Sequence, residues 1–95
     1  MARYLIRIEL HGPAADHARL NEIMATLGAE RTILGSNDQP WHLPTGEYVT
    51  HTDPGAAAAI RDLIRPALPP AGSDPEAWVL VIEVVDAAWF TKAAE

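Results

Sequence analysis

The first ten residues alternate apolar and polar side chains, and this alternation constrains the fold more than any other feature of the chain. The apolar positions of residues 3–10 are Tyr4, Ile6, Ile8 and Leu10. The intervening positions are Arg3, Leu5, Arg7 and Glu9. A period of two is typical of a β-strand with one buried face. The chain is therefore expected to begin with a half-buried strand whose other face carries two arginines.

Two later segments place apolar residues at helical spacing. The first spans roughly residues 13–27 and ends at Gly28, which favours a left-handed helix end. The second follows Asp53 and Pro54, an N-cap residue and a proline suited to the first turn. Its predicted buried stripe is Ile60, Leu63, Ile64 and Ala67. Both segments are expected to pack on the apolar face of a sheet.

The remaining apolar segments predict three more strands, at residues 31–35, 47–51 and 78–85. The resulting order, β-α-β-β-α-β, is that of the ferredoxin-like fold. It predicts an α+β domain with a four-stranded antiparallel sheet, strands 1 and 3 central, and two helices on one face. A chain of 95 residues is expected to form one such domain over residues 1–95.

Composition limits the class of function. The chain has no cysteine, so disulfides, thiolate metal sites and thiol nucleophiles are excluded. Four histidines occur without a metal-binding motif, and we predict neither a metal site nor a cofactor. No apolar run reaches the 18 or so residues of a membrane helix, and the first residues do not resemble a secretory signal. We therefore expect a soluble cytoplasmic protein without a membrane partner.

The net charge of −6 argues against a long nucleic-acid footprint held by phosphate contacts, and we predict no DNA partner. A short RNA contact is compatible with this charge. Arg3 and Arg7 share one face of the first strand about 13 Å apart, and Arg31 is expected on a neighbouring strand. These three side chains could bind adjacent phosphates of single-stranded RNA. The alternative is that they form cross-strand ion pairs with Glu47 or Glu83.

Several segments of the chain resemble one small family. They are residues 3–6 (RYLI), Leu20 with Ile23-Met24, residues 39–43 (QPWHL), residues 60–65 (IRDLIR), and Val85-Asp86 with Trp89-Phe90. Together they resemble the endoribonuclease antitoxins of type V toxin–antitoxin systems, the GhoS family. The resemblance covers nearly the whole chain and implies a ferredoxin-like fold. It also implies cleavage of a small membrane toxin's mRNA with little or no dependence on metal.

One departure from the family concerns the first helix. The arginine that the family places there falls on Asn21, whereas Arg19 lies two positions earlier. An amide cannot stabilise a developing phosphorane charge as a guanidinium does. Either Arg19 replaces the family arginine through a shift of the helix, or this protein does not cut RNA.

If cleavage occurs, the candidate proton-transfer groups are His17, His51 and Tyr48, with Arg19, Arg3 and Arg7 as phosphate clamps. The candidate catalytic residues are then Arg19, His17 and His51. We therefore expect an antitoxin-like RNA-binding protein that is also a candidate endoribonuclease.

A second hypothesis needs no RNA. The two helices cover only one face of the predicted sheet, and the other face lacks a cover in this chain. Apolar residues expected on that open face are Leu5, Val79, Val81 and Val85. A non-enzymatic module could use this face to form a homodimer or to bind a protein partner.

Overall fold

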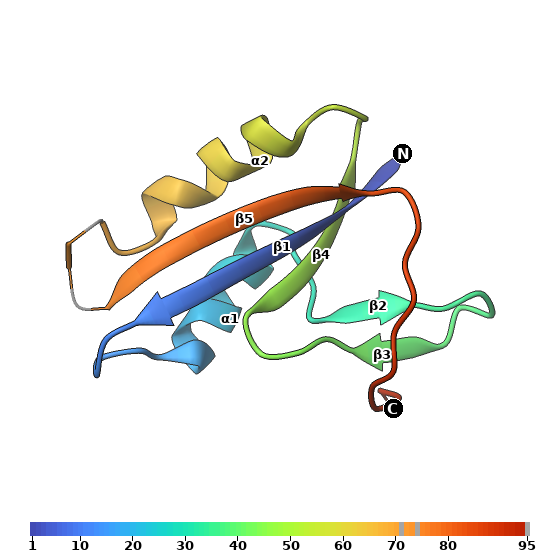
Figure 1. The fold of residues 1–95 in the computed structure, drawn as a ribbon, viewed down its shortest axis with the longest axis horizontal. Coiled ribbons are helices and arrows are strands. Elements are labelled where there is room, and N and C mark those ends of the chain that lie inside the picture. The colour runs from blue at the N-terminus through green and yellow to red at the C-terminus, as the bar shows by residue number, and fades with distance from the viewer. Residues whose placement is uncertain (71, 74, 95) are drawn as a thin grey trace.

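The computed structural model describes residues 1–70, 72–73 and 75–94. It is an α+β structure in which two helices cover one face of a sheet (Figure 1). In chain order the elements are β1 (Ala2–His11), α1 (His17–Thr26), β2 (Thr32–Leu34), β3 (Pro40–His42), β4 (Glu47–Thr52), α2 (Ala57–Ile64), the 3₁₀ helix η1 (Arg65–Ala67) and β5 (Glu76–Val84). Within the described residues, no helix is long and apolar enough to cross a membrane.

The main sheet has three antiparallel strands in the order β4-β1-β5. The predicted alternation in β1 is confirmed, because Tyr4, Ile6 and Ile8 are buried against both helices. From the helices, Leu20 and Met24 of α1 belong to the same core. Strand β1 is central, as expected, since it pairs with β4 on one side and with β5 on the other.

The expected four-stranded ferredoxin-like sheet is wrong. Strand β2 does not join the main sheet but pairs with β3 in a separate two-stranded sheet. Beside β4, where the fourth strand was expected, there is one isolated bridge between Glu30 and Val49. Two backbone hydrogen bonds of 2.8 Å form this bridge. Beyond this bridge the chain turns away from β4 and forms the β2–β3 hairpin.

The segment before β4 lies close to β1. Gly46 has φ of +84°, and a Cβ at this position would lie 2.5 Å from the carbonyl oxygen of Ile8. Only glycine fits this close approach to β1. Strand β4 begins at the next residue, Glu47. The free side of β3 is filled by the C-terminal segment, where His42 N–H donates to the carbonyl of Lys92 at 2.9 Å.

Both helices start later than the sequence predicts. Helix α1 begins at His17 because the Asp16 side chain accepts the backbone N–H of Arg19 at 3.0 Å. Helix α2 begins at Ala57, and the hydroxyl oxygen of Tyr4 accepts the backbone N–H of Ala56 at 2.8 Å. The buried hydroxyl of Tyr4 in β1 thus caps α2. This contact is long-range, so no local sequence pattern predicts it.

The buried stripe of α2 also differs from the prediction. Ile60 and Ile64 are buried as expected, and the next member is Leu68 beyond η1. The spacing of four residues leaves Leu63 on the outer flank, where it is 62% exposed, and Ala67 is exposed as well. The prediction of Leu63 and Ala67 as core residues was therefore wrong.

In β5, the two predicted faces are correct but the open one was misidentified. Directly opposed residues of an antiparallel pair share a face. Val81 is opposite the buried Ile6, so Val79 and Val81 point toward the helices. Leu80 is opposite Arg7 and lies on the open face. The exposed apolar side chains of β5 are Trp78, Leu80 and Ile82, while Val85 lies beyond the strand.

Part of the open face is covered by the chain itself. After β5, residues 85–94 run down beside the main sheet, pass in front of the β2–β3 hairpin and reach β3 (Figure 1). Below this segment, Leu5, Val49 and Val84 line a cavity of about 230 Å³ together with Trp89 and Phe90. The open face is thus divided into a covered part near β4 and an exposed part along β5.

Candidate functional site

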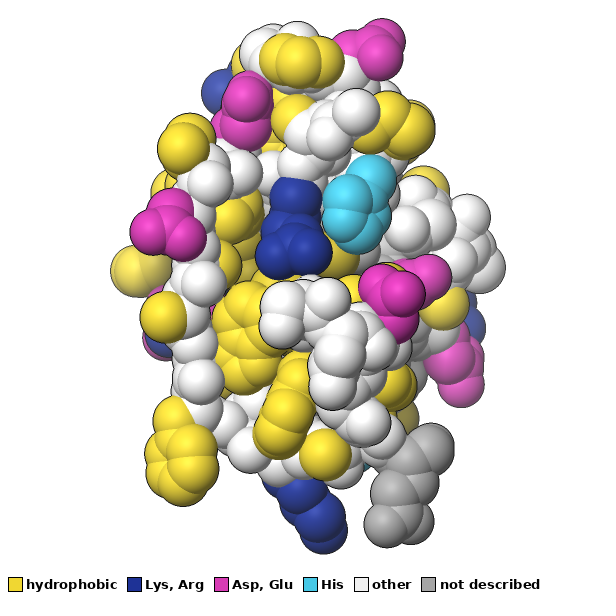
Figure 2. Space-filling model, turned by 90° about the vertical axis from the view of Figure 1, so that its right-hand side faces the viewer, with side chains coloured by type: hydrophobic (Ala, Val, Ile, Leu, Met, Phe, Trp, Pro, Cys, Tyr) yellow, Lys and Arg dark blue, Asp and Glu magenta, His cyan; other side chains and the backbone are white. Residues whose placement is uncertain are grey.

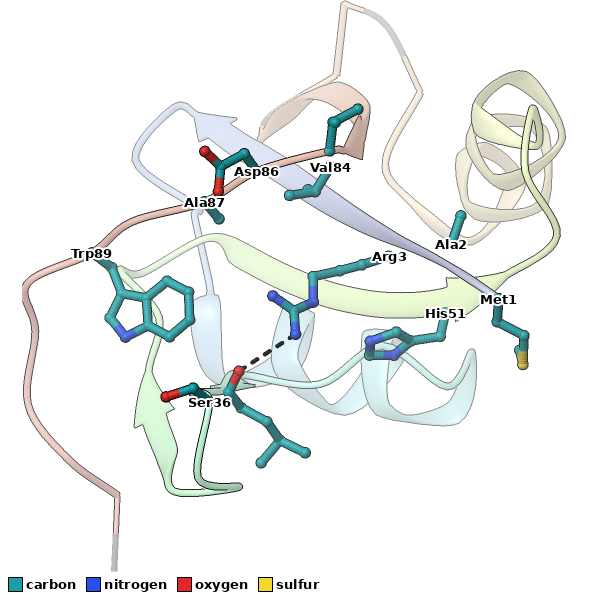
Figure 3. A pocket seen from close by; sticks show the side chains of 12 residues that line it. Met1, Ala2, Arg3, Ser36, His51, Val84, Asp86, Ala87 and Trp89 are labelled. Carbon is teal, nitrogen blue, oxygen red and sulfur yellow. Dashed lines mark hydrogen bonds between the residues drawn. The ribbon is translucent and has the colours of Figure 1, made fainter.

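The strongest candidate site is a cavity of about 520 Å³ on the open side of the sheet. It forms where the start of β1, the β2–β3 hairpin and the C-terminal segment meet (Figure 3). Its polar side chains are Arg3, Ser36, His51 and Asp86, and its aromatic side chain is Trp89. These residues come from four segments that are distant in the sequence, so only the fold brings them together.

Arg3 is the central charge of this cavity. Its Nη2 donates to the Leu34 carbonyl at 3.4 Å, a long hydrogen bond that directs the guanidinium toward the hairpin (Figure 3). Within the described part of the chain, no carboxylate oxygen lies within 4.0 Å of its nitrogens. A guanidinium has five N–H donors. Most of the donor capacity of Arg3 is therefore available to a ligand.

The expected ion pairs of the strand arginines do not occur among residues 1–70, 72–73 and 75–94. Glu83 lies on the helix-facing side of β5, where it accepts the backbone N–H of Gly55 at 2.8 Å. Glu47 is opposite Arg7 in the β1–β4 ladder without forming an ion pair. Neither glutamate neutralises Arg3.

His51 is the second ionisable group of the cavity. It is opposite Arg3 in the β1–β4 ladder, so both side chains lie on the same face. In Figure 3 the imidazole points into the same hollow as the guanidinium. His51 is exposed, which leaves it accessible to a ligand bound at Arg3.

Trp89 extends the cavity into a groove. The same indole borders a second hollow of about 570 Å³, which is lined by Trp41 of β3 and by the hairpin turn. The two cavities share Gly35, Ser36, Ala87 and Trp89. We call the combined surface the Arg3 groove and define it by Arg3, Ser36, Trp41, His51 and Trp89.

The face that carries this groove is shown in Figure 2. A basic side chain and a histidine lie side by side on this face, and hydrophobic side chains border the basic one. An acidic side chain lies beside the histidine. The cavity thus combines the Arg3 guanidinium, which has no carboxylate within 4.0 Å among the described residues, with one carboxylate, Asp86, on a protein of net charge −6.

Arg31, predicted to bind RNA, has a different environment. Its Nη1 donates to the carbonyls of Pro44 and Glu47 at 2.7 and 2.8 Å. The guanidinium carbon lies 5.6 Å from the ring centre of Tyr48. Arg31 thus ties the connection between β3 and β4 to the core, and it lines neither cavity of the Arg3 groove.

Tyr48, a candidate proton-transfer group, is fully buried. Its hydroxyl donates to Oδ1 of Asn21 at 2.5 Å. Burial raises the pKa of Tyr48, and the nearby Arg31 only partly opposes this effect. Asn21, which stands where the resemblance expects a catalytic arginine, instead accepts a hydrogen bond that joins α1 to β4.

The remaining predicted site residues are not brought together with Arg3. Arg19 and His17 are exposed on α1, the helix that packs on the opposite face of the sheet. Nη1 of Arg19 lies 3.8 Å from Glu22 Oε2, one turn along the helix. Arg7 is exposed four residues farther along β1, outside both cavities. Of the predicted residues, only Arg3 and His51 share a site.

Sequence reasoning did not assign Ser36, Trp41 or Trp89 to the site. Their only local signals were the turn-forming composition of residues 36–40 and the aromatic pair that follows β5. In the described residues, His, Asp and Glu side chains form no group of three that could hold a metal ion.

No protein-family model matches this chain, and no curated protein or solved structure matches it significantly.

Proposed function

We propose that this protein binds single-stranded RNA in the Arg3 groove, as a small antitoxin-like RNA-binding protein. The observation that carries the proposal is the position of Arg3, which has no carboxylate partner among the described residues and stands between His51 and the indole of Trp89. A guanidinium binds phosphate through paired hydrogen bonds, and an indole stacks on an unpaired base. The groove combines both contacts.

The net charge of the protein limits how many RNA phosphates it can bind. With a net charge of −6, the surface as a whole repels a polyanion, so the contact must be short. One or two neutralised phosphates give a weak salt dependence, with a slope of about −0.7 in log K against log salt for each phosphate of a single strand. Stacking on tryptophan supplies sequence-tolerant affinity that salt does not screen.

RNA cleavage is an extension of this proposal. His51 can transfer a proton to or from a ribose hydroxyl near a phosphate held by Arg3. Asp86 lines the same cavity and is available as a second proton-transfer group. The toxin mRNA implied by the family resemblance is the target to test first.

The test is fluorescence anisotropy with short labelled RNAs at low salt. We expect binding to a single-stranded RNA, weaker binding to the matching RNA duplex, and weaker binding of the Arg3→Ala variant to the single strand. Arg61→Ala is the matched control, because Arg61 is an exposed arginine on α2 that pairs with Asp62. Absence of binding to any single-stranded RNA at low salt would overturn the proposal.

Cleavage is followed on gels of the same RNAs, with and without EDTA. Cleavage that is lost in His51→Ala but kept in His17→Ala would extend the proposal from binding to catalysis. Intact RNA in every lane would limit the protein to binding.

A further inference from the structure

Strand β5 is the outer strand of the main sheet on the side opposite β4, and α2 packs along it (Figure 1). Its one strand neighbour in the described part of the chain is β1. Outside that ladder, no backbone group of residues 76–84 takes part in a hydrogen bond with another described residue. The opposite edge, β4, is protected by the bridge from Glu30. One edge of the sheet is thus closed, and the other presents a row of N–H and C=O groups.

The sequence of β5 has one feature that disfavours pairing, the inward-facing carboxylate of Glu83, and lacks the others. Edge strands commonly carry proline, lysine, an inward-facing charge or a bulge that prevents contact with another chain. Residues 76–84 (EAWVLVIEV) contain neither proline nor lysine and form nine uninterrupted strand positions. The open-face side chains Trp78, Leu80 and Ile82 are 56%, 53% and 45% exposed. An apolar stripe therefore runs beside the unpaired backbone groups.

We propose that β5 pairs antiparallel with β5 of a second copy, which joins two sheets into one of six strands. The pairing is centred on Leu80, so that Leu80 is opposite its own equivalent and Trp78 is opposite Ile82. In this register the whole strand is paired.

The pattern of β5 favours a second copy over an unrelated strand. A two-fold axis at Leu80 places the exposed side chains of Trp78, Leu80 and Ile82 beside the same three side chains of the second copy. A two-fold interface requires such a match, because both copies contribute the same surface. Glu76 falls opposite Val84, and Glu83 falls opposite Ala77. No like charges are opposed, although the protein is acidic. The six open-face side chains form one apolar patch across the joint.

The size of the contact predicts a weak dimer. One strand and three large side chains from each copy bury less than the roughly 800 Å² per partner of a standard interface. The dimer should therefore dissociate on dilution through the micromolar range. Because this interface and the Arg3 groove use different side chains, the proposal does not depend on RNA binding.

The absence of cysteine allows a direct test of the register by disulfide crosslinking. Directly opposed residues in an antiparallel pair have Cα atoms about 4.5–5.5 Å apart, within the range of a disulfide. Under mild oxidation we expect the Leu80→Cys variant to form a covalent dimer. In the Trp78→Cys variant, each cysteine is opposite Ile82 of the other copy, so the two cysteines lie four strand positions apart, about 13 Å. The same holds for Ile82→Cys, and neither single variant should crosslink. The double variant with both cysteines restores opposed pairs and should crosslink.

Leu63→Cys is the matched control, since Leu63 is a similarly exposed leucine on α2, outside β5. Equal crosslinking at positions 63 and 80 would overturn the proposal. Crosslinking of Trp78→Cys alone as fast as Leu80→Cys would also overturn it, because it would indicate a different contact.

Light scattering over a dilution series provides the second measurement. We expect the average mass of the unmodified protein to rise toward that of a dimer with concentration. Leu80→Lys should remain monomeric, whereas Leu63→Lys should behave like the parent, with circular dichroism confirming that both variants fold. A parent that is monomeric at high micromolar concentration would overturn the proposal.

Discussion

Arg3 lies directly opposite His51 in the ladder between β1 and β4, and both side chains enter the same cavity. Because the two residues are far apart in the sequence, no local pattern predicts that they are opposed. The antiparallel register creates it, because opposed residues share a face of the sheet. Trp89 then closes the site from the C-terminal segment, so that a cation, an imidazole and an indole line one groove (Figure 3).

Arg3 and Arg7 are expected to differ in RNA binding, although they share one face of β1. Arg3→Ala should weaken binding of single-stranded RNA by about 1–3 kcal/mol, as expected for loss of a charge-assisted hydrogen bond. The salt slope should fall by about 0.7. Arg7→Ala should retain affinity, because Arg7 lines neither cavity of the groove. Anisotropy titrations at several salt concentrations measure both effects. An equal loss in both variants would assign binding to the whole open face instead.

Trp89 is expected to contribute a stacking contact. Trp89→Ala should reduce RNA affinity by about 1–3 kcal/mol, the usual contribution of one stacked base, with little change in salt dependence. Phe90→Ala is the control, because Phe90 is the adjacent aromatic residue, is exposed and lines neither cavity of the Arg3 groove. A Trp89→Ala variant that binds RNA as well as the parent would contradict the stacking role.

Ile64 and Leu63 test the assignment of the buried stripe of α2. Ile64→Ala should lower the free energy of unfolding by about 2–5 kcal/mol, because it removes a buried side chain and leaves a cavity. Leu63→Ala should lower it by at most about 0.5 kcal/mol, as is usual for an exposed position. Urea titrations of the two variants give the comparison. Similar losses in both would place Leu63 in the core.

Tyr48 should make stability depend on pH in the alkaline range. Burial is the main cause of the raised pKa of Tyr48 in the folded state, and Arg31 opposes it. The folded protein therefore holds the phenolic proton more tightly than the unfolded chain. The resulting stabilisation is present below pH ~10, the unfolded pKa, and decreases as the pH rises through the folded pKa.

Tyr48→Phe measures this contribution. At neutral pH it should lower the free energy of unfolding by about 1–3 kcal/mol, because Oδ1 of Asn21 loses its donor. The difference from the parent should shrink above pH ~10. Denaturant titrations of the parent and the variant, at neutral pH and above pH ~10, measure this difference. A difference that grows with pH would contradict the predicted direction.

Local sequence patterns predicted much of the secondary structure. The alternation of residues 3–10 identified β1 and its buried side chains, because the side-chain period of a strand is local. Helical spacing located α1 and α2 in the same way and identified Ile60 and Ile64 as core residues. The start of each helix was less accessible to such reasoning. The cap of α2 is the hydroxyl of Tyr4, which is 52 residues away in the chain.

The pairing of the strand edges and the role of each arginine depend on tertiary contacts. Local periodicity does not record whether β2 continues beside β4 or turns away after Glu30, because the alternatives differ only in long-range pairing, here with β3. Arg3 lies in β1 and Arg31 lies directly before β2, so the two arginines look alike in the sequence. Arg31 is directed to the backbone carbonyls of Pro44 and Glu47, whereas Arg3 faces a groove closed by a segment more than 80 residues away. Hydrogen-bond partners brought in from distant segments, rather than residue type, make one arginine structural and leave the other available to a ligand.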